Sequence, residues 1–140
     1  MDKSFIGALF FDEPPGTFSE GYVFTAPPDL SAVEQESDIG HWSCDLADHD
    51  RLTWSDKVYE LFGLPVGTPI DRDSAMSHYS DGSRDVLERV RNYALRCKFG
   101  FMLDAAIEPE EGGVRSIRVL AVPRLDGNRV VRLEGLKRAL

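Results

Sequence analysis

Two neighbouring stretches of the sequence decide the fold, GHWSCDL (residues 40–46) and LTWSDKVYELFGLP (residues 52–65). In the first stretch, Trp42 and Cys44 alternate with polar residues, and this period of two predicts a β-strand. The second stretch begins as another short strand. Ser55 follows as the N-cap of a helix, because its hydroxyl can accept from the free backbone N–H groups of the first turn. Together the two stretches predict two strands followed by a short helix.

The second half of the chain predicts one long helix and three further strands. Residues 83–98 carry an apolar stripe with charged residues on the other face, which is typical of an amphipathic helix. Residues 101–108, 114–122 and 128–136 each alternate apolar with other side chains, so we expect three strands. LDGN (residues 125–128) has the composition of a hairpin turn. Tight turns between consecutive strands predict antiparallel pairing.

The chain before Gly40 has a different character. Residues 1–28 contain two proline pairs and three glycines, which predict an arm without a long regular element. The arm is rich in aromatic and aliphatic side chains, so we expect it to lie against the domain or a partner subunit. Residues 29–39 have the capping-box spacing Ser31 to Glu34 and predict a short capping helix that ends at Gly40.

Composition and charge limit the possible functions. The 140 residues, 42% hydrophobic and 29% charged, suit one globular domain. The formal net charge of −8 argues against binding to nucleic acid or to anionic lipid. Cys44 and Cys97 alone make no disulfide framework, and no apolar run is long enough to span a bilayer. We therefore expect a cytoplasmic protein without a membrane partner.

The order of the elements and the motifs resemble a bacterial PAS domain. LTWSDKVYELFGLP is the most specific motif, and it is similar to the family pattern W-S-x-x-V-Y-x-L-F-G-L. GHWSCDL resembles the first PAS strand, YSDGSR (residues 79–84) the start of the long helix, and RLEG (residues 132–135) the last strand. Ser80 and Gly82 depart from the family's proline and carboxylate, and LKRAL stands where a signalling helix usually begins.

The resemblance implies an α+β fold, with a five-stranded antiparallel sheet and helices on one face. The PAS-like domain would span residues 40–140, preceded by the arm (residues 1–28) and the capping helix (residues 29–39). The implied function is a sensory or regulatory module that senses a small ligand or mediates protein–protein interaction in bacterial signal transduction. It would be a homodimer with a signalling partner in trans, such as a histidine kinase or a cyclase.

Two alternatives remain open, a ligand-free PAS-like adaptor that acts only by pairing and a small NTF2-like enzyme. The sequence contains no nucleophile elbow, phosphate loop or apolar pair of carboxylates, so we assign no catalytic residue and expect no enzyme activity. His41 and Cys44 would point to opposite faces of a strand, so we expect no metal site. The cysteine motif of flavin-binding relatives is absent, and the long helix lacks the histidine of haem-binding relatives. The sequence therefore favours neither cofactor.

A pocket could form between the helices and the sheet. The candidate residues are the large apolar and aromatic side chains predicted to face it: Trp42, Trp54, Phe62, Tyr79, Tyr93, Phe101 and Val119. Each could instead be ordinary core, since aromatic residues dominate the buried area of small domains.

The other face of the sheet also carries apolar residues. Leu120, Val122 and Val130 fall opposite the predicted core face, which suggests a contact surface. We expect either dimerisation through this face, covered by the N-terminal helix, or an arm that folds back on its own sheet.

Overall fold

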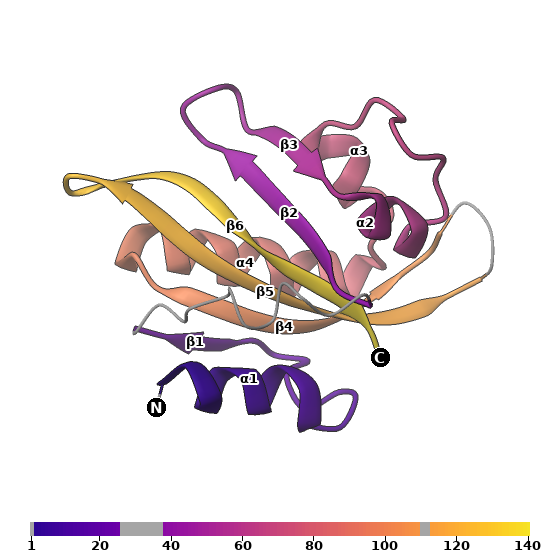
Figure 1. Ribbon diagram of the computed structural model, residues 1–140, viewed down its shortest axis with the longest axis horizontal. Helices are drawn as coiled ribbons and strands as arrows, with labels where there is room; N and C mark the ends of the chain where they lie inside the picture. Colours follow the sequence, from indigo (N-terminus) through magenta and orange to yellow (C-terminus); the bar gives the residue numbers. More distant parts are fainter. Residues whose placement is uncertain (1, 26–37, 110–112) are drawn as a thin grey trace.

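A computed structural model describes residues 2–25, 38–109 and 113–140. These parts form a six-stranded antiparallel sheet, ordered β1-β4-β5-β6-β2-β3, with helices on both faces (Figure 1). The strands are β1 (Tyr22–Phe24), β2 (Gly40–Asp45), β3 (Arg51–Trp54), β4 (Gly100–Ile107), β5 (Arg115–Asp126) and β6 (Arg129–Ala139). The helices are α1 (Asp2–Asp12), α2 (Asp56–Leu61), α3 (Arg72–Met76) and α4 (Asp81–Cys97).

The predicted α+β class and antiparallel sheet are confirmed, but two details of the prediction are wrong. The sheet has six strands instead of five, because Val23 of β1 pairs with Phe101 of β4. The arm does contain a regular element, the 11-residue helix α1. The prolines that argued against a helix begin only at Pro14, after α1 has ended at Asp12. Residues 29–37 of the predicted capping helix lie outside the described residues.

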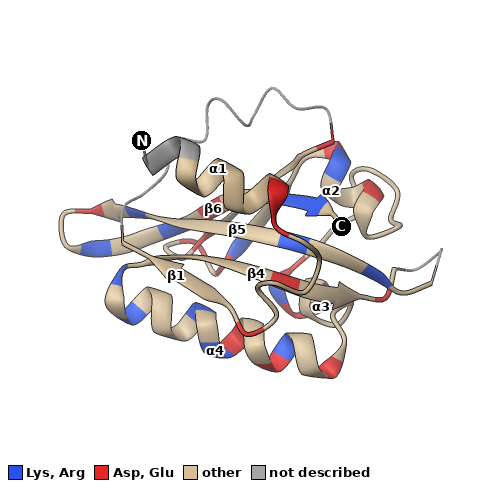
Figure 2. Ribbon diagram, turned by 90° about the horizontal axis from the view of Figure 1, so that it is seen from below, with Lys and Arg blue, Asp and Glu red and all other residues tan. Residues whose placement is uncertain are grey.

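The inner face of the sheet packs against α2, α3 and α4 (Figure 1). On β4 and β5 the predicted alternation is confirmed, and the buried inner residues are Phe101, Leu103, Ala105, Ile107, Ile117, Val119 and Ala121. The helix predicted from residue 83 begins at Asp81, because Ser80 is its N-cap and accepts from the backbone N–H of Ser83. Figure 2 shows positive and negative residues interspersed along α4, as expected for its solvent-facing side.

The N-terminal arm covers the outer face of the same sheet. Figure 2 shows α1 and α4 on opposite sides of the strands. A second apolar cluster joins the arm to the sheet, and its buried members are Ile6, Phe10, Phe18, Phe24, Ile39, Met102, Leu120, Val122 and Leu136. The arm therefore folds back on its own sheet, and Leu120 and Val122 are buried within the chain. Val130 is only half-buried and does not belong to this cluster.

A buried ion pair lies beneath the arm, and we call Asp104 and Arg118 the arm-binding pair. The two residues are direct cross-strand neighbours on β4 and β5, and Arg118 Nε lies 2.6 Å from Asp104 Oδ1. The carboxylate accepts from the backbone N–H groups of Gly16 and Phe18, both at 3.0 Å. The guanidinium donates to arm carbonyl oxygens at 2.9–3.2 Å, those of Leu9, Phe10, Glu13 and Pro14.

Arg138 extends this polar row onto β6. It is the cross-strand neighbour of Arg118 and donates to the carbonyl oxygens of Phe10 and Phe11, each at 2.9 Å. Burial lowers the pKa of Arg138, and the nearby positive charge of Arg118 lowers it further. Two arginines thus satisfy carbonyl groups at the end of α1, which have no partner within the helix.

Candidate functional site

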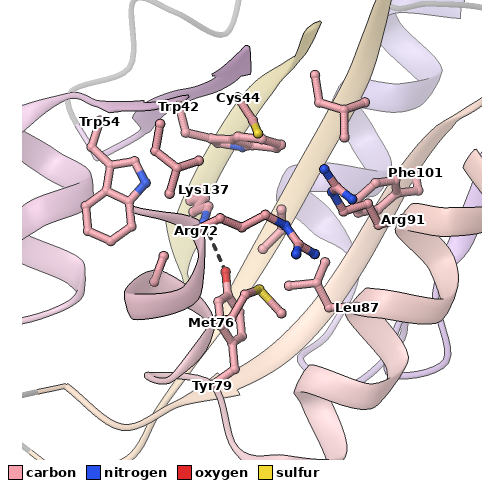
Figure 3. Close-up of a pocket in the computed structure, with 14 residues that line it drawn as sticks. Trp42, Cys44, Trp54, Arg72, Met76, Tyr79, Leu87, Arg91, Phe101 and Lys137 are labelled. Atoms are coloured by element: carbon pink, nitrogen blue, oxygen red, sulfur yellow. Dashed lines mark hydrogen bonds between the residues drawn. The ribbon is translucent and has the colours of Figure 1, made fainter. Parts of the chain in front are cut away.

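A cavity of about 60 Å³ lies between the inner face of the sheet and the helices α3 and α4 (Figure 3). Apolar side chains from the sheet and the helices make most of its wall, and three cationic side chains also face it: Arg72, Arg91 and Lys137. No Asp or Glu belongs to the part of the wall that the structure describes. The site is therefore small, largely apolar and positively charged.

Strand pairing places the two tryptophans at this cavity. Trp42 on β2 lies directly opposite Trp54 on β3 and, on its other side, opposite Gly135 on β6. Trp54 in turn stacks on Phe62 behind it, with 4.7 Å between the ring centroids. Because cross-strand neighbours project to the same face, the register alone brings both indoles to the inner side.

Lys137 points into a box of four aromatic rings. It lies on the inner face of β6, is 6% exposed, and donates from Nζ to the hydroxyl oxygen of Tyr79 at 3.0 Å. The ammonium nitrogen lies 5.1–5.7 Å from the ring centroids of Trp42, Trp54, Phe62 and Tyr79, which we call the aromatic box. Each such contact stabilises a cation by between about 0.5 kcal/mol at exposed sites and about 2 kcal/mol when desolvated.

The two arginines differ from Lys137 in having acidic neighbours. Arg72 of α3 pairs with Glu88 of α4, and Arg91 of α4 lies 3.7 Å from a carboxylate oxygen of Asp50. Lys137 has no carboxylate within ion-pair distance among the residues that the structure describes. A buried cation without a counter-ion is costly, so its position calls for a functional explanation.

Two other polar atoms belong to this site. The indole Nε1 of Trp42 is buried and has no hydrogen-bond partner among the described residues. The buried Cys44 also lines the cavity. Burial raises the pKa of the Cys44 thiol, although the nearby Arg91 acts in the opposite direction. Cys44 therefore remains a protonated thiol near neutral pH, which is a poor nucleophile.

The structure brings five of the seven predicted pocket residues to the cavity wall: Trp42, Trp54, Tyr79, Phe101 and Val119. Phe62 lies behind Trp54, where it completes the aromatic box without lining the cavity. Tyr93 lies elsewhere, 41% exposed and next to Phe99. The buried stripe of α4 is made by Leu87, Val90 and Ala94, and Tyr93 projects beside that stripe.

Sequence reasoning missed the three cations of the wall. For Lys137 a signal was present, because Leu133, Gly135 and Lys137 share one face of a strand by period-two alternation. The predicted strand ended at residue 136, one residue before Lys137, whereas β6 continues to Ala139. For Arg72 and Arg91 no comparable signal exists, since charged residues on helices usually face solvent.

Two further observations concern the described residues. They contain no group of three or more His, Cys, Asp or Glu side chains that could hold a metal ion. None of the helices they form combines the length and the apolar character required to cross a membrane.

Comparison with known proteins supports the fold. No family model matches the sequence, and no curated protein matches it. Among solved structures, the chain is similar to the N-terminal domain of a diguanylate cyclase with PAS/PAC sensor from Marinobacter aquaeolei. The identity is 14%, the TM-score is 0.65, and the match covers 72% of this chain and 94% of that one.

Two other solved structures give the same result. A sensory box histidine kinase/response regulator from Burkholderia thailandensis E264 matches at 12% identity and a TM-score of 0.63, over 79% of this chain and 80% of that one. The PAS domain of the fruit-fly ELK potassium channel matches at 11% identity and a TM-score of 0.59, over 79% and 94%. At these identities the likeness concerns the fold, so the resemblance predicted from the motifs is confirmed at that level: the chain has a PAS fold.

Proposed function

We propose that this chain is a sensory module that binds a small ligand in the cavity beside Lys137. One observation carries the proposal: the buried ammonium group of Lys137 lines a cavity in the apolar core and has no counter-ion among the described residues. The aromatic box offsets part of the cost of burying this cation, but a ligand-free adaptor would gain nothing from a cation at this position. The cavity and its polar groups thus favour sensing over the adaptor alternative.

The signal would be a shift between two arrangements of the arm on the sheet. A ligand can shift such an equilibrium only by contacting the two states differently. Lys137 faces the cavity, whereas its neighbours Leu136 and Arg138 contact the arm on the other face of β6. A ligand that repositions Lys137 would therefore act within one residue of the contacts that bind α1.

The remaining parts of the proposal concern partners. We propose a cytoplasmic bacterial module, residues 40–140 with the arm, that works as a homodimer on a signalling protein in trans, such as a histidine kinase or a cyclase. The exposed apolar side chains of Phe5, Phe11 and Val23 on the arm support a protein contact there. We propose no catalytic activity, since the described residues of the cavity wall offer neither a carboxylate nor an activated nucleophile.

The test is native mass spectrometry of the full chain purified from its own host, compared with the denatured mass. We expect a non-covalent adduct that disappears in Lys137→Met and persists in Lys98→Met, which removes the same charge from an exposed position. A clean apo spectrum, together with no binding in a small-molecule screen, would contradict ligand sensing. The same spectra report the oligomeric state, and a monomer throughout would contradict the homodimer.

A further inference from the structure

The polar groups of the cavity are almost all hydrogen-bond donors. Lys137 has three N–H donors, of which the hydroxyl oxygen of Tyr79 accepts one. Within the described residues, no group accepts the hydrogen of that hydroxyl, so it can donate to a ligand. Trp42 adds a buried Nε1–H group that has no partner in the described part of the chain. Around this cavity, donors therefore outnumber acceptors, and a ligand rich in acceptor oxygens would satisfy them.

The charge of the cavity wall also bears on the kind of ligand. Figure 3 shows Arg72, Arg91 and Lys137 at the cavity. The acidic neighbours of the two arginines do not belong to its wall. Lys137 fills the aromatic box with its own ammonium group. A cationic ligand would therefore find the box occupied and would be repelled. An anion would instead supply the counter-ion that Lys137 lacks within the described part of the chain.

The volume of the cavity limits the size of the ligand. Pockets for drug-sized ligands measure about 300–1,000 Å³. The cavity here is about 60 Å³, several times smaller than such pockets. Its size therefore favours a ligand much smaller than a drug-sized molecule. The apolar remainder of the wall, which includes Leu133 and Met76, suits a short alkyl group.

From these three observations we infer that the ligand is a small carboxylate anion, of the size of formate, acetate or propionate. This inference rests on the proposed function and names the ligand class of the same site. Lys137 Nζ donates to one carboxylate oxygen, and the hydroxyl of Tyr79 and Nε1 of Trp42 are the further donors. The alkyl group contacts the apolar wall.

The two tryptophans of the chain allow a direct test, because each gives one indole N–H signal in a ¹H–¹⁵N spectrum. The full-length protein is titrated with acetate and, separately, with acetamide, its neutral isostere, and with methylammonium. Sodium gluconate, an anion too large for the cavity, keeps the ionic strength constant. Trp54→Phe assigns the Trp42 signal. We expect acetate to shift that signal saturably, and acetamide and methylammonium to leave it in place.

Variants show whether Lys137 is responsible. Lys137→Met should weaken acetate binding by about 10- to 100-fold, the effect of losing a charge-assisted hydrogen bond. Lys98→Met, with the same change in net charge at an exposed position, should bind acetate as the wild type does. If Lys137→Met does not fold, the comparison of acetate with acetamide in the wild type still decides the matter.

The outcomes separate this inference from the proposed function. If acetamide binds as tightly as acetate, or if a folded Lys137→Met keeps its affinity, the carboxylate inference is wrong while a ligand site remains. If formate, acetate and propionate all leave the Trp42 signal unchanged, the inference is also wrong. In that case the native mass spectrum alone decides whether the chain senses another ligand.

Discussion

Replacing Arg118 with methionine tests how the N-terminal arm is held on the sheet. The Arg118 side chain is fully buried and pairs with Asp104, whose side chain is 4% exposed. Removing one partner of a buried ion pair costs about 3–5 kcal/mol, because the other charge stays buried without compensation. The substitution also leaves the carbonyl oxygens of Leu9, Phe10, Glu13 and Pro14 without their shared donor. We therefore expect Arg118→Met to lower the free energy of unfolding by about 3–5 kcal/mol.

Two measurements separate loss of the arm from global loss of stability. Urea unfolding followed by tryptophan fluorescence reports the core, since Trp42 and Trp54 both lie on the inner face. Amide hydrogen exchange of residues 5–18 reports the arm, and we expect this segment to lose protection first in Arg118→Met. The control is Arg124→Met, which breaks the half-exposed pair with Glu134 and should cost less than about 1 kcal/mol.

A double variant tests whether the uncompensated charge of Asp104 causes the loss of stability in Arg118→Met. Adding Asp104→Asn to Arg118→Met removes the uncompensated charge, so the double variant should be more stable than Arg118→Met alone. The reasoning fails if the free energy of unfolding of Arg118→Met lies within about 1 kcal/mol of the wild-type value, the range of an exposed pair, and the arm stays protected from exchange. That result would mean that the apolar contacts of Phe10 and its neighbours hold the arm without the arm-binding pair.

Four further substitutions of single residues have expected outcomes. Gly135→Ala would place a Cβ 1.8 Å from the carbonyl oxygen of Leu120, so we expect a loss of about 3 kcal/mol or more in urea unfolding. Gly82→Ala meets nothing within 4 Å and should instead be neutral or stabilising by up to about 1 kcal/mol. Phe10→Ala removes a fully buried ring beneath α1 and should cost about 3–5 kcal/mol in the same assay; a cost below 1 kcal/mol would contradict the packing described. Burial raises the pKa of Cys44 in the folded state, so the folded protein keeps the proton that the unfolded chain loses. Stability should therefore fall as the pH rises above the ordinary thiol pKa, and Cys44→Val should flatten that part of the pH profile.

The inner half of the fold was predictable because its signals are local. Strand alternation at residues 101–107 and 117–121, and the stripe of α4, repeat often enough to identify the buried face. The arm was not predictable in this way. The apolar residues of α1 are followed closely by Pro14 and Pro15, and nothing in the sequence says that Arg118 lies across the sheet to satisfy the end of that helix. The contacts between Arg118 and the arm join residues 104–109 positions apart.

The candidate site was also predictable only in part. Its aromatic wall could be predicted, since large apolar residues at inner positions of strands must face the helices. Its charge could not, because the register that places Lys137 in the aromatic box depends on how β6 pairs with β2 and β5. That pairing includes Gly40 opposite Lys137 on one side and Val119 on the other.

β6 shows why this register is closely specified. Its cations face opposite sides, with Lys137 in the aromatic box and Arg138 against α1. Because side chains alternate along a strand, a slip by one residue would exchange them, burying Arg138 in the box and leaving Lys137 beneath the arm. Gly135 opposes such a slip, since any side chain there would collide with the backbone of Leu120. β6 thus carries both Lys137 and the arm contacts of Leu136 and Arg138, and it is held in a single register between β2 and β5. In the proposed function, a change at Lys137 would reach α1 along this strand without any change in strand pairing.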